Sequence, residues 1–311
     1  MLCVVLCSIA LFGFIFFIIL NNKIYHSDRY KNRFAYAFYY LDNKHENNEI
    51  VFLGSTYAQF ACQSIDAFNV SASNLGCYAR PLEYDLSILK KECENVVEKG
   101  KVVLILSPCI LLVDDGYEDL SGNHCLIFKK SELRKISLRQ YIKIKYPIFN
   151  LKVWKDVLYD EGYIGIEEKY LKETHLKDAE SNMIDRINIW KKQLKVSDFK
   201  NVIIDKEKEQ VIQCNISYLK RIEEECKKRK LEVYFVTMPI SSYLYDQYSE
   251  ATLDEILYKP LKGTFTMDQI IDFIHDDDFK RADLYVDGGF LLNSVGSKLF
   301  IKKIYDLIFS K

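Results

Sequence analysis

The chain has 311 residues, of which 49% are hydrophobic, so it can bury a full core in one or two domains. Its 43 basic and 44 acidic residues give a net charge of −1 at pH 7. Because the two signs are interleaved along the chain, we expect no strongly positive surface and no nucleic-acid partner.

Residues 2–20 contain no charged side chain and are about long enough to cross a ~30 Å hydrocarbon core as one helix. They predict a single-pass membrane anchor at residues 1–22. A cleaved signal peptide and a buried core helix are the alternatives, but no small-residue cleavage pattern precedes Asn21 and the apolar run exceeds a usual signal core. Basic residues follow the span at positions 23, 29, 31 and 33, and they favour a cytoplasmic body.

Residues 23–48 mix polar and aromatic side chains, which predicts a helical or irregular stalk. Four of its tyrosines, Tyr25, Tyr30, Tyr39 and Tyr40, would lie at the membrane interface or pack onto the folded domain. The domain itself is predicted for residues 49–311.

Residues 50–53 form a short apolar run with the β-branched and aromatic character of a strand that is covered on both faces. Gly54 permits a tight turn after this strand, and Ser55 then opens a helix. A hydroxyl in that position suits a nucleophile, because N–H groups of the first helical turn can stabilise an oxyanion. It equally suits ordinary N-capping.

Residues 66–76 are predicted to be a second strand, which ends at residues 74–76. A helix then begins at Pro81, since apolar residues recur at positions 82, 86, 89, 93 and 96. Gly100 ends this helix, and residues 101–108 are a third strand. The order of strand, helix and strand predicts a parallel sheet with right-handed crossovers.

The alternation stops at about residues 110–210, which are charged, aromatic and mainly helical. We interpret them as an insertion that could form a lid or a partner surface. Its basic segment at residues 129–145 either contacts anionic lipid head groups or is a solvated helix face.

Regular alternation returns with a helix at residues 212–229, a strand at 231–237 and another strand near 269–274. The last helix begins near Asn293 and is expected to bury Leu299, Phe300, Ile304, Leu307 and Ile308. The seven cysteines beyond the anchor are scattered without a CxxC pair, so they are expected to be small buried residues rather than disulfides or zinc ligands. The fold class is therefore α/β, with a central parallel sheet in three layers and a helical insertion.

In open parallel sheets, ligands bind beyond the carboxyl ends of the strands, so the residues that follow each strand are candidates for a site. Four segments there, VFLGSTYAQF, SNLGCYARPLEYDLSILKK, LKRIEEECKKRKLEVYFVTMP and LYVDGGFLLNSVGSKLF, resemble blocks of the SGNH/GDSL hydrolase superfamily. The resemblance covers about two thirds of the chain, and membrane-anchored, DltD-like and capsule-associated members are the most similar. It implies an SGNH/flavodoxin-like α/β/α fold and an extracytoplasmic body.

The resemblance also implies site residues. Ser55 matches the nucleophile, Asp287 matches the catalytic aspartate, and the backbones of Thr56 and Gly76 match oxyanion donors. The family histidine, three residues after the aspartate, is missing, because Phe290 stands there. The family block Gly-x-Asn-Asp is also missing, since Ser107 and its neighbours follow the third strand instead.

His275 is a possible substitute base, because it precedes three aspartates that could orient an imidazole. His124 and His175 would reach the site only if the insertion folds over it, and all three have the alternative of being ordinary surface residues. No histidine, cysteine or carboxylate group has metal-ligand spacing, so we expect no metal and no cofactor.

A serine without a base is a weak nucleophile at neutral pH. The leading hypothesis is therefore a membrane-anchored SGNH-like protein of cell-surface polysaccharide assembly or modification, weakened or inactive as an acyl esterase or acyltransferase. An active O-acyl esterase or O-acyltransferase that uses Ser55 on a glycan is the first alternative. A structural membrane protein that binds assembly proteins through its insertion is the second.

Overall fold

The computed structural model of the chain describes residues 2–67, 70–78, 81–114, 122–150, 162–174 and 178–309. The chain forms two compact units. The N-terminal unit comprises Met1–Leu41 and Glu118–Tyr170, and the sheet unit comprises Asp42–Tyr117 and Leu171–Lys311. The first part of the predicted insertion thus folds with the N-terminal residues.

In the N-terminal unit, the first helix is α1 (Leu2–Tyr25), which is long and apolar enough to cross a membrane. Its large apolar side chains from Val5 to Ile19 are mostly exposed, as expected of a helix that is not part of a protein core. Shorter helices follow: α2 (Asp28–Arg33), α3 (Ala35–Asp42), α6 (His124–Ile127), α7 (Leu138–Lys145) and α9 (Ile166–Thr174), with 3-10 turns η4 (Lys130–Glu132) and η5 (Pro147–Phe149).

An aromatic core joins α2 and α3 to the chain around α6 and α7. The ring of Tyr30 lies 4.9 Å from that of Phe34, and its hydroxyl donates a hydrogen bond to the Ile144 carbonyl. The Ala37 N–H donates to Asn123 Oδ1 at 3.3 Å. Tyr30 and Tyr40 are buried, so these two tyrosines pack inside the protein rather than at a membrane interface.

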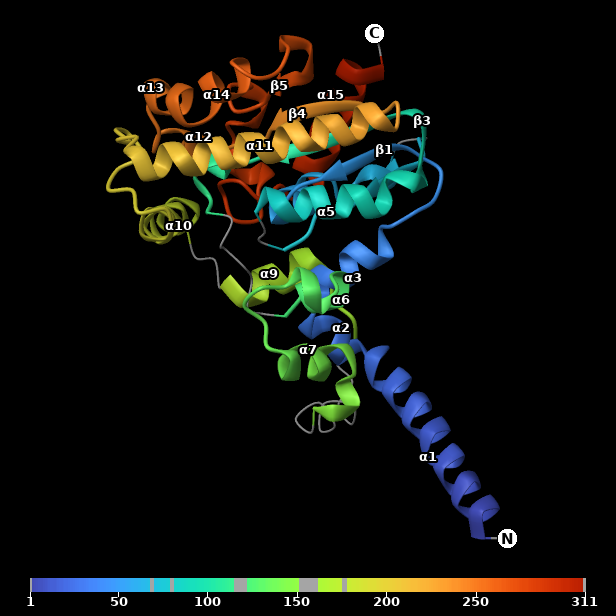
Figure 1. Cartoon of the computed structure of the whole chain (residues 1–311). Coiled ribbons are helices and arrows are strands. Elements are labelled where there is room, and N and C mark those ends of the chain that lie inside the picture. The colour runs from blue at the N-terminus through green and yellow to red at the C-terminus, as the bar shows by residue number, and fades with distance from the viewer. Residues whose placement is uncertain are drawn as a thin grey trace. The chain divides into compact units, whose positions relative to one another are not determined.

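The sheet unit contains a five-stranded, all-parallel sheet in the order β2-β1-β3-β4-β5, and its helices surround these strands in Figure 1. The strands are β1 (Asn48–Leu53), β2 (Ala72–Asn74), β3 (Val96–Leu106), β4 (Glu232–Thr237) and β5 (Ile270–Asp272). Val51 pairs with Val102, and Leu104 pairs with Phe235. The strands predicted at residues 50–53, 101–108 and 231–237 are therefore adjacent parallel strands, and the predicted parallel sheet is confirmed.

The start of β3 differs from the prediction. The helix α5 (Leu82–Glu92) ends early, a turn η2 (Cys93–Asn95) follows, and Val96 already pairs with Asn48 of β1. The β-branched Val96 and Val97 favour extended backbone over a continued helix. Lys99 has φ +63°, and the register of β3 shifts near Gly100. Gly100 therefore lies in an irregular part of the strand and does not end a helix.

The other helices of the sheet unit are α4 (Thr56–Ala61), α10 (Ala179–Gln193), α11 (Lys206–Lys228), α12 (Ser242–Tyr245), α13 (Glu250–Leu253), α14 (Lys259–Lys262) and α15 (Ser294–Phe309), with a π-helix η6 (Asp254–Tyr258) and 3-10 turns η1 (Ile65–Ala67), η3 (Ile110–Leu112), η7 (Met267–Gln269), η8 (Asp277–Phe279) and η9 (Ala282–Leu284). Of these, α4, α11 and α15 correspond to predicted helices, whereas those between β4 and β5 were not predicted. In Figure 1, α5 and α11 lie side by side, and they pack together. The helix α15 packs against α4.

Two predicted details of these helices are wrong. The helix α11 starts at Lys206 instead of residue 212, because the Asp205 carboxylate caps it by accepting the Lys208 N–H at 2.9 Å. Leu307 is 46% exposed, whereas Ile301, which the prediction left out, is buried in its place. The expectation for the cysteines is confirmed, since six of those beyond α1 are buried free thiols.

Candidate functional site

The candidate site lies where β1 and β3 end. Gly54 follows β1 with φ +135°, and a Cβ atom there would lie 2.9 Å from the Ile105 carbonyl oxygen of β3, so only glycine fits this turn. Ser55 comes next and precedes α4 in extended conformation. Its side chain makes no capping hydrogen bond to the first turn of α4, all of which the structure describes. Ser55 is thus the N-cap residue of α4 by position but does not cap it with its side chain, and the residue lines a cavity.

This cavity has a volume of about 170 Å³. Ser55 and Tyr57 line it from the end of β1, and Ser107 and Cys109 line it from the end of β3. Trp190 of α10 and Leu194 add apolar surface to the lining, and Asp114 and Gln193 add polar groups. The chain leaves β1 toward β2 on one side and reaches β3 on the other, so the cavity lies at the topological switch point of the sheet, where parallel sheets bind ligands.

Two lining groups are neutral at physiological pH. Burial raises the pKa of the Tyr57 phenol, and the neighbouring Cys109 adds to this effect. Burial also raises the pKa of Cys109 to about 12, against a hydrogen bond with Tyr248 that lowers it. Because only the thiolate is a strong nucleophile, Cys109 is an unreactive wall of the cavity.

Asp287 is 1% exposed and holds a tight turn. Its Oδ1 accepts the backbone N–H groups of Gly289, Phe290 and Leu291, each at 3.0 Å. Its Oδ2 is buried and has no hydrogen-bond partner among the described residues. Burial raises the pKa of Asp287, although the three N–H groups and the Arg186 charge oppose this shift.

The turn of Asp287 contacts the cavity through Phe290. The Phe290 ring lies 5.2 Å from the Tyr57 ring and 4.9 Å from the Trp190 ring. Phe290 thus occupies the position that the SGNH resemblance gives to the catalytic base. The helix α10 packs so closely on this turn that a Cβ atom at Gly289 would lie 1.8 Å from Met183 Sδ.

Of the two expected oxyanion donors, Thr56 begins α4 and Gly76 follows β2. The Gly76 N–H donates to Asn74 Oδ1 at 3.0 Å. The Asn74 amide in turn donates to the Ala58 and Gln59 carbonyls, at 3.1 Å and 3.2 Å, which fixes the end of β2 against α4. Thr56 begins α4, so its N–H belongs to the turn whose N–H groups lack intrahelical acceptors.

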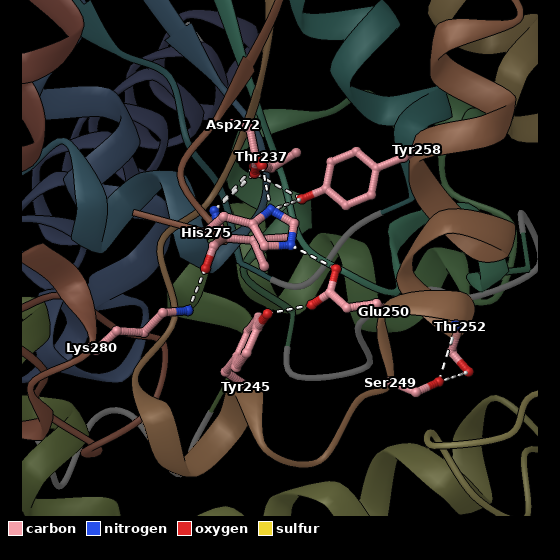
Figure 2. A network of polar contacts seen from close by, with 10 residues as sticks. Thr237, Tyr245, Ser249, Glu250, Thr252, Tyr258, Asp272, His275 and Lys280 are labelled. Carbon is pink, nitrogen blue, oxygen red and sulfur yellow. Dashed lines mark hydrogen bonds and ion pairs between the residues drawn. The ribbon is translucent and has the colours of Figure 1, made fainter. Parts of the chain in front are cut away.

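His275 is not among the described residues that line the Ser55 cavity. It follows β5, and β3 and β4 lie between β5 and β1. At ~4.8 Å per strand, β5 is therefore roughly 14 Å from β1. Its Nδ1 lies 2.5 Å from Asp272 Oδ2, and its Nε2 lies 3.0 Å from Glu250 Oε2 (Figure 2). The three aspartates that follow His275 are not the carboxylates that hold its ring, since Asp276 and Asp278 pair with Lys303 at 2.6 Å each.

The residues around His275 form a closed polar network (Figure 2). Asp272 Oδ1 accepts hydrogen bonds from the hydroxyls of Thr237 and Tyr258, each at 2.7 Å. Burial disfavours the charged imidazole, but the hydrogen bond and charge of Asp272, followed by those of Glu250, raise the pKa of His275 above its ordinary value. Both ring nitrogens are thus held by carboxylates, whereas a general base needs an open nitrogen.

The remaining histidines of the insertion do not complete the site. His124 is buried in the N-terminal unit, and His175 lies outside the described residues. Among the residues that the structure describes, no group of three or more potential ligands could hold a metal ion. Sequence reasoning named Ser55, Ser107 and Asp287, but it missed Tyr57 and Trp190. The only sequence signal for Tyr57 was that an aromatic residue stands two positions after Ser55.

Comparison of the chain with models of known protein families and with curated proteins finds no match.

Proposed function

We propose that the protein is a membrane-anchored member of the SGNH/GDSL hydrolase type that acts in cell-surface polysaccharide assembly or modification. Its Ser55 cavity would bind an acyl ester group of a glycan and would cleave or transfer that group weakly or not at all. One observation carries the proposal: Ser55 lines a cavity at the switch point, and Phe290 stands three residues after Asp287, where the resemblance puts the base.

The proposed three-layer arrangement is supported by the strand order 2-1-3-4-5, which is that of flavodoxin-like doubly wound sheets. Right-handed crossovers would place α4, between β1 and β2, on the face opposite α5 and α11. The packing of α5 with α11, and of α15 with α4, agrees with two separate helical layers.

The proposed ligand follows from the size and chemistry of the cavity. Its volume of about 170 Å³ is below the ~300 Å³ at which pockets for drug-sized ligands begin, so it suits a short acyl group rather than a whole sugar unit. Trp190 and Leu194 offer apolar contact to such a group, and the hydroxyls of Ser55 and Ser107 can donate to its carbonyl oxygen.

We further propose that α1 is a single-pass anchor. A role on surface glycans requires an extracytoplasmic body, as the family resemblance implies, whereas the basic residues that follow the span favour the cytoplasmic side. Protease treatment of the full chain in sealed right-side-out vesicles decides between the two sides of the membrane. A body that is protected from the protease lies on the cytoplasmic side and would contradict the surface role.

An active O-acyl esterase or O-acyltransferase is the second candidate. The free orientation of the Ser55 hydroxyl and the unpartnered Asp287 Oδ2, among the described residues, favour it, because both groups would be available for chemistry.

The binding proposal is tested with the detergent-solubilised full chain and an O-acetylated methyl glycoside. Saturation-transfer NMR should show contact through the acetyl methyl group in the wild type, and Ser55→Phe, which fills the cavity, should abolish it. Ser217→Phe is the control, because Ser217 lies on the outer side of α11. Equal signals from the wild type and Ser55→Phe would refute binding at this cavity.

A further inference from the structure

The N-terminal unit holds a second cavity, of about 540 Å³, with a different chemistry. Three cationic side chains line it: Arg33 at the end of α2, and Arg139 and Lys143 on α7. Arg139 and Lys143 are four residues apart and therefore share one face of the helix. In the described part of the chain, none of the three forms an ion pair with a carboxylate. The cavity thus concentrates uncompensated positive charge in a chain whose net charge is −1.

The turn η5, which precedes the lining residue Asn150, packs against the apolar helix α1. The Phe149 ring packs 5.3 Å from that of Phe17, and the Ile148 N–H donates to Asn21 Oδ1 at 3.3 Å. Phe17 is three residues before the end of the uncharged run at Leu20, or ~4.5 Å along the helix axis. If α1 spans the bilayer as proposed, Phe149 lies at the hydrocarbon boundary.

Asn150, which follows Phe149, then lies at head-group depth, because each head-group layer is only ~5–7 Å thick. Asn150 lines the cavity. Large apolar side chains are exposed around the same segment, with Leu138 at 61% and Phe149 at 52%. Exposed apolar residues interleaved with cations are typical of an interfacial helix, whereas a merely solvated helix face carries no such apolar residues.

We propose that this cavity binds the phosphate head group of an anionic membrane lipid. Arg139 can bind phosphate oxygens through two parallel N–H donors, and Lys143 and Arg33 add charge. The Ser137 hydroxyl accepts the Gln140 N–H at 3.2 Å and can donate its own proton to the phosphate. Leu138 and Phe149 would contact the acyl chains. The inference rests on the proposed anchor and not on the chemistry of Ser55.

The test uses the full chain in mixed micelles that contain either phosphatidylglycerol or zwitterionic phosphatidylcholine. Lipid retention is measured by native mass spectrometry. Arg139→Gln/Lys143→Gln should weaken phosphatidylglycerol binding roughly 25-fold, at about fivefold for each cation near a membrane surface. Lys129→Gln/Lys130→Gln removes the same charge from residues that do not line the cavity, and it should change binding less than about threefold.

Equal unfolding midpoints of both variants in phosphatidylcholine establish that each is folded. Equal loss of binding in the two variants would overturn the proposal, since it indicates diffuse charge rather than a site. Inorganic phosphate that fully displaces phosphatidylglycerol from the chain in phosphatidylcholine micelles would also overturn the proposal, because the site would then take a soluble anion. Release of the wild-type chain from membranes by alkaline extraction would refute the anchor as well, so the two failures are distinguishable.

Discussion

The turn held by Asp287 gives the most quantitative prediction. Asp287→Ala removes one oxygen that accepts three buried N–H groups. Each buried donor left without a partner costs about 1–3 kcal/mol, so after partial relaxation we expect a loss of about 3–5 kcal/mol in the free energy of unfolding. Asp287→Asn keeps the accepting oxygen and should stay within about 1 kcal/mol of the wild type.

The pH dependence separates the charge of Asp287 from its hydrogen bonds. Because burial raises its pKa above the unfolded value of 3.8, the folded state binds more protons there, and its stability falls as pH rises from 3.8 through the raised pKa. Asp287→Asn mimics the protonated form and should remove this slope. Urea unfolding of all three proteins between pH 4 and pH 8 measures both effects. Equal losses for Asp287→Ala and Asp287→Asn would refute the reasoning.

Three further predictions concern other parts of the chain. His275 has a raised pKa, so its ion pairs stabilise the fold below pH 6.5 and stop doing so as pH rises through the raised value. Since the ring is partly exposed, we expect His275→Gln to lower the free energy of unfolding by less than about 1 kcal/mol at pH 5.5 and not at all at pH 9. A loss that is independent of pH would contradict this. Gly289→Ala should lower the free energy of unfolding by about 1–3 kcal/mol through its clash with Met183, and Met183→Ala should partly restore it. Gly165→Ala is the neutral control, because a Cβ atom there has nothing within 4 Å. A Gly289→Ala variant as stable as the wild type would show that α10 does not pack as described. Deletion of residues 1–22 should give a soluble protein that unfolds cooperatively in urea, because the sheet unit has its own core, and recovery only in aggregates would contradict that.

The strands could be predicted from the sequence because their chemistry is local. Continuous apolar runs such as residues 102–106 are buried on both faces, and such runs occur in parallel sheets. The start of β3 was not predictable by the same reasoning. Residues 82–96 keep a helical spacing of apolar residues, and the preference of Val96 and Val97 for extended backbone prevails there only together with the pairing of Val96 with Asn48, which is far away in sequence.

The candidate site was predictable only in the part that the sheet itself positions. Ser55 and Ser107 follow adjacent strands, so the rule for parallel sheets places them together. Trp190 lines the cavity from a helix more than 130 residues after Ser55, which no local pattern shows. The partners of His275 were also misjudged, because Glu250 approaches it from a different helix while the adjacent aspartates turn to Lys303.

The central claim is that Ser55 lines a binding cavity that has lost its catalytic base. The most direct measurement combines turnover of p-nitrophenyl acetate with labelling by a serine-directed fluorophosphonate, using the full chain, Ser55→Ala and the surface control Ser217→Ala. The account predicts that all three proteins hydrolyse the ester at the same low rate and that none is labelled, since a serine without a base keeps little reactivity. Turnover and labelling that are lost in Ser55→Ala but kept in Ser217→Ala would contradict the claim and establish an active serine esterase.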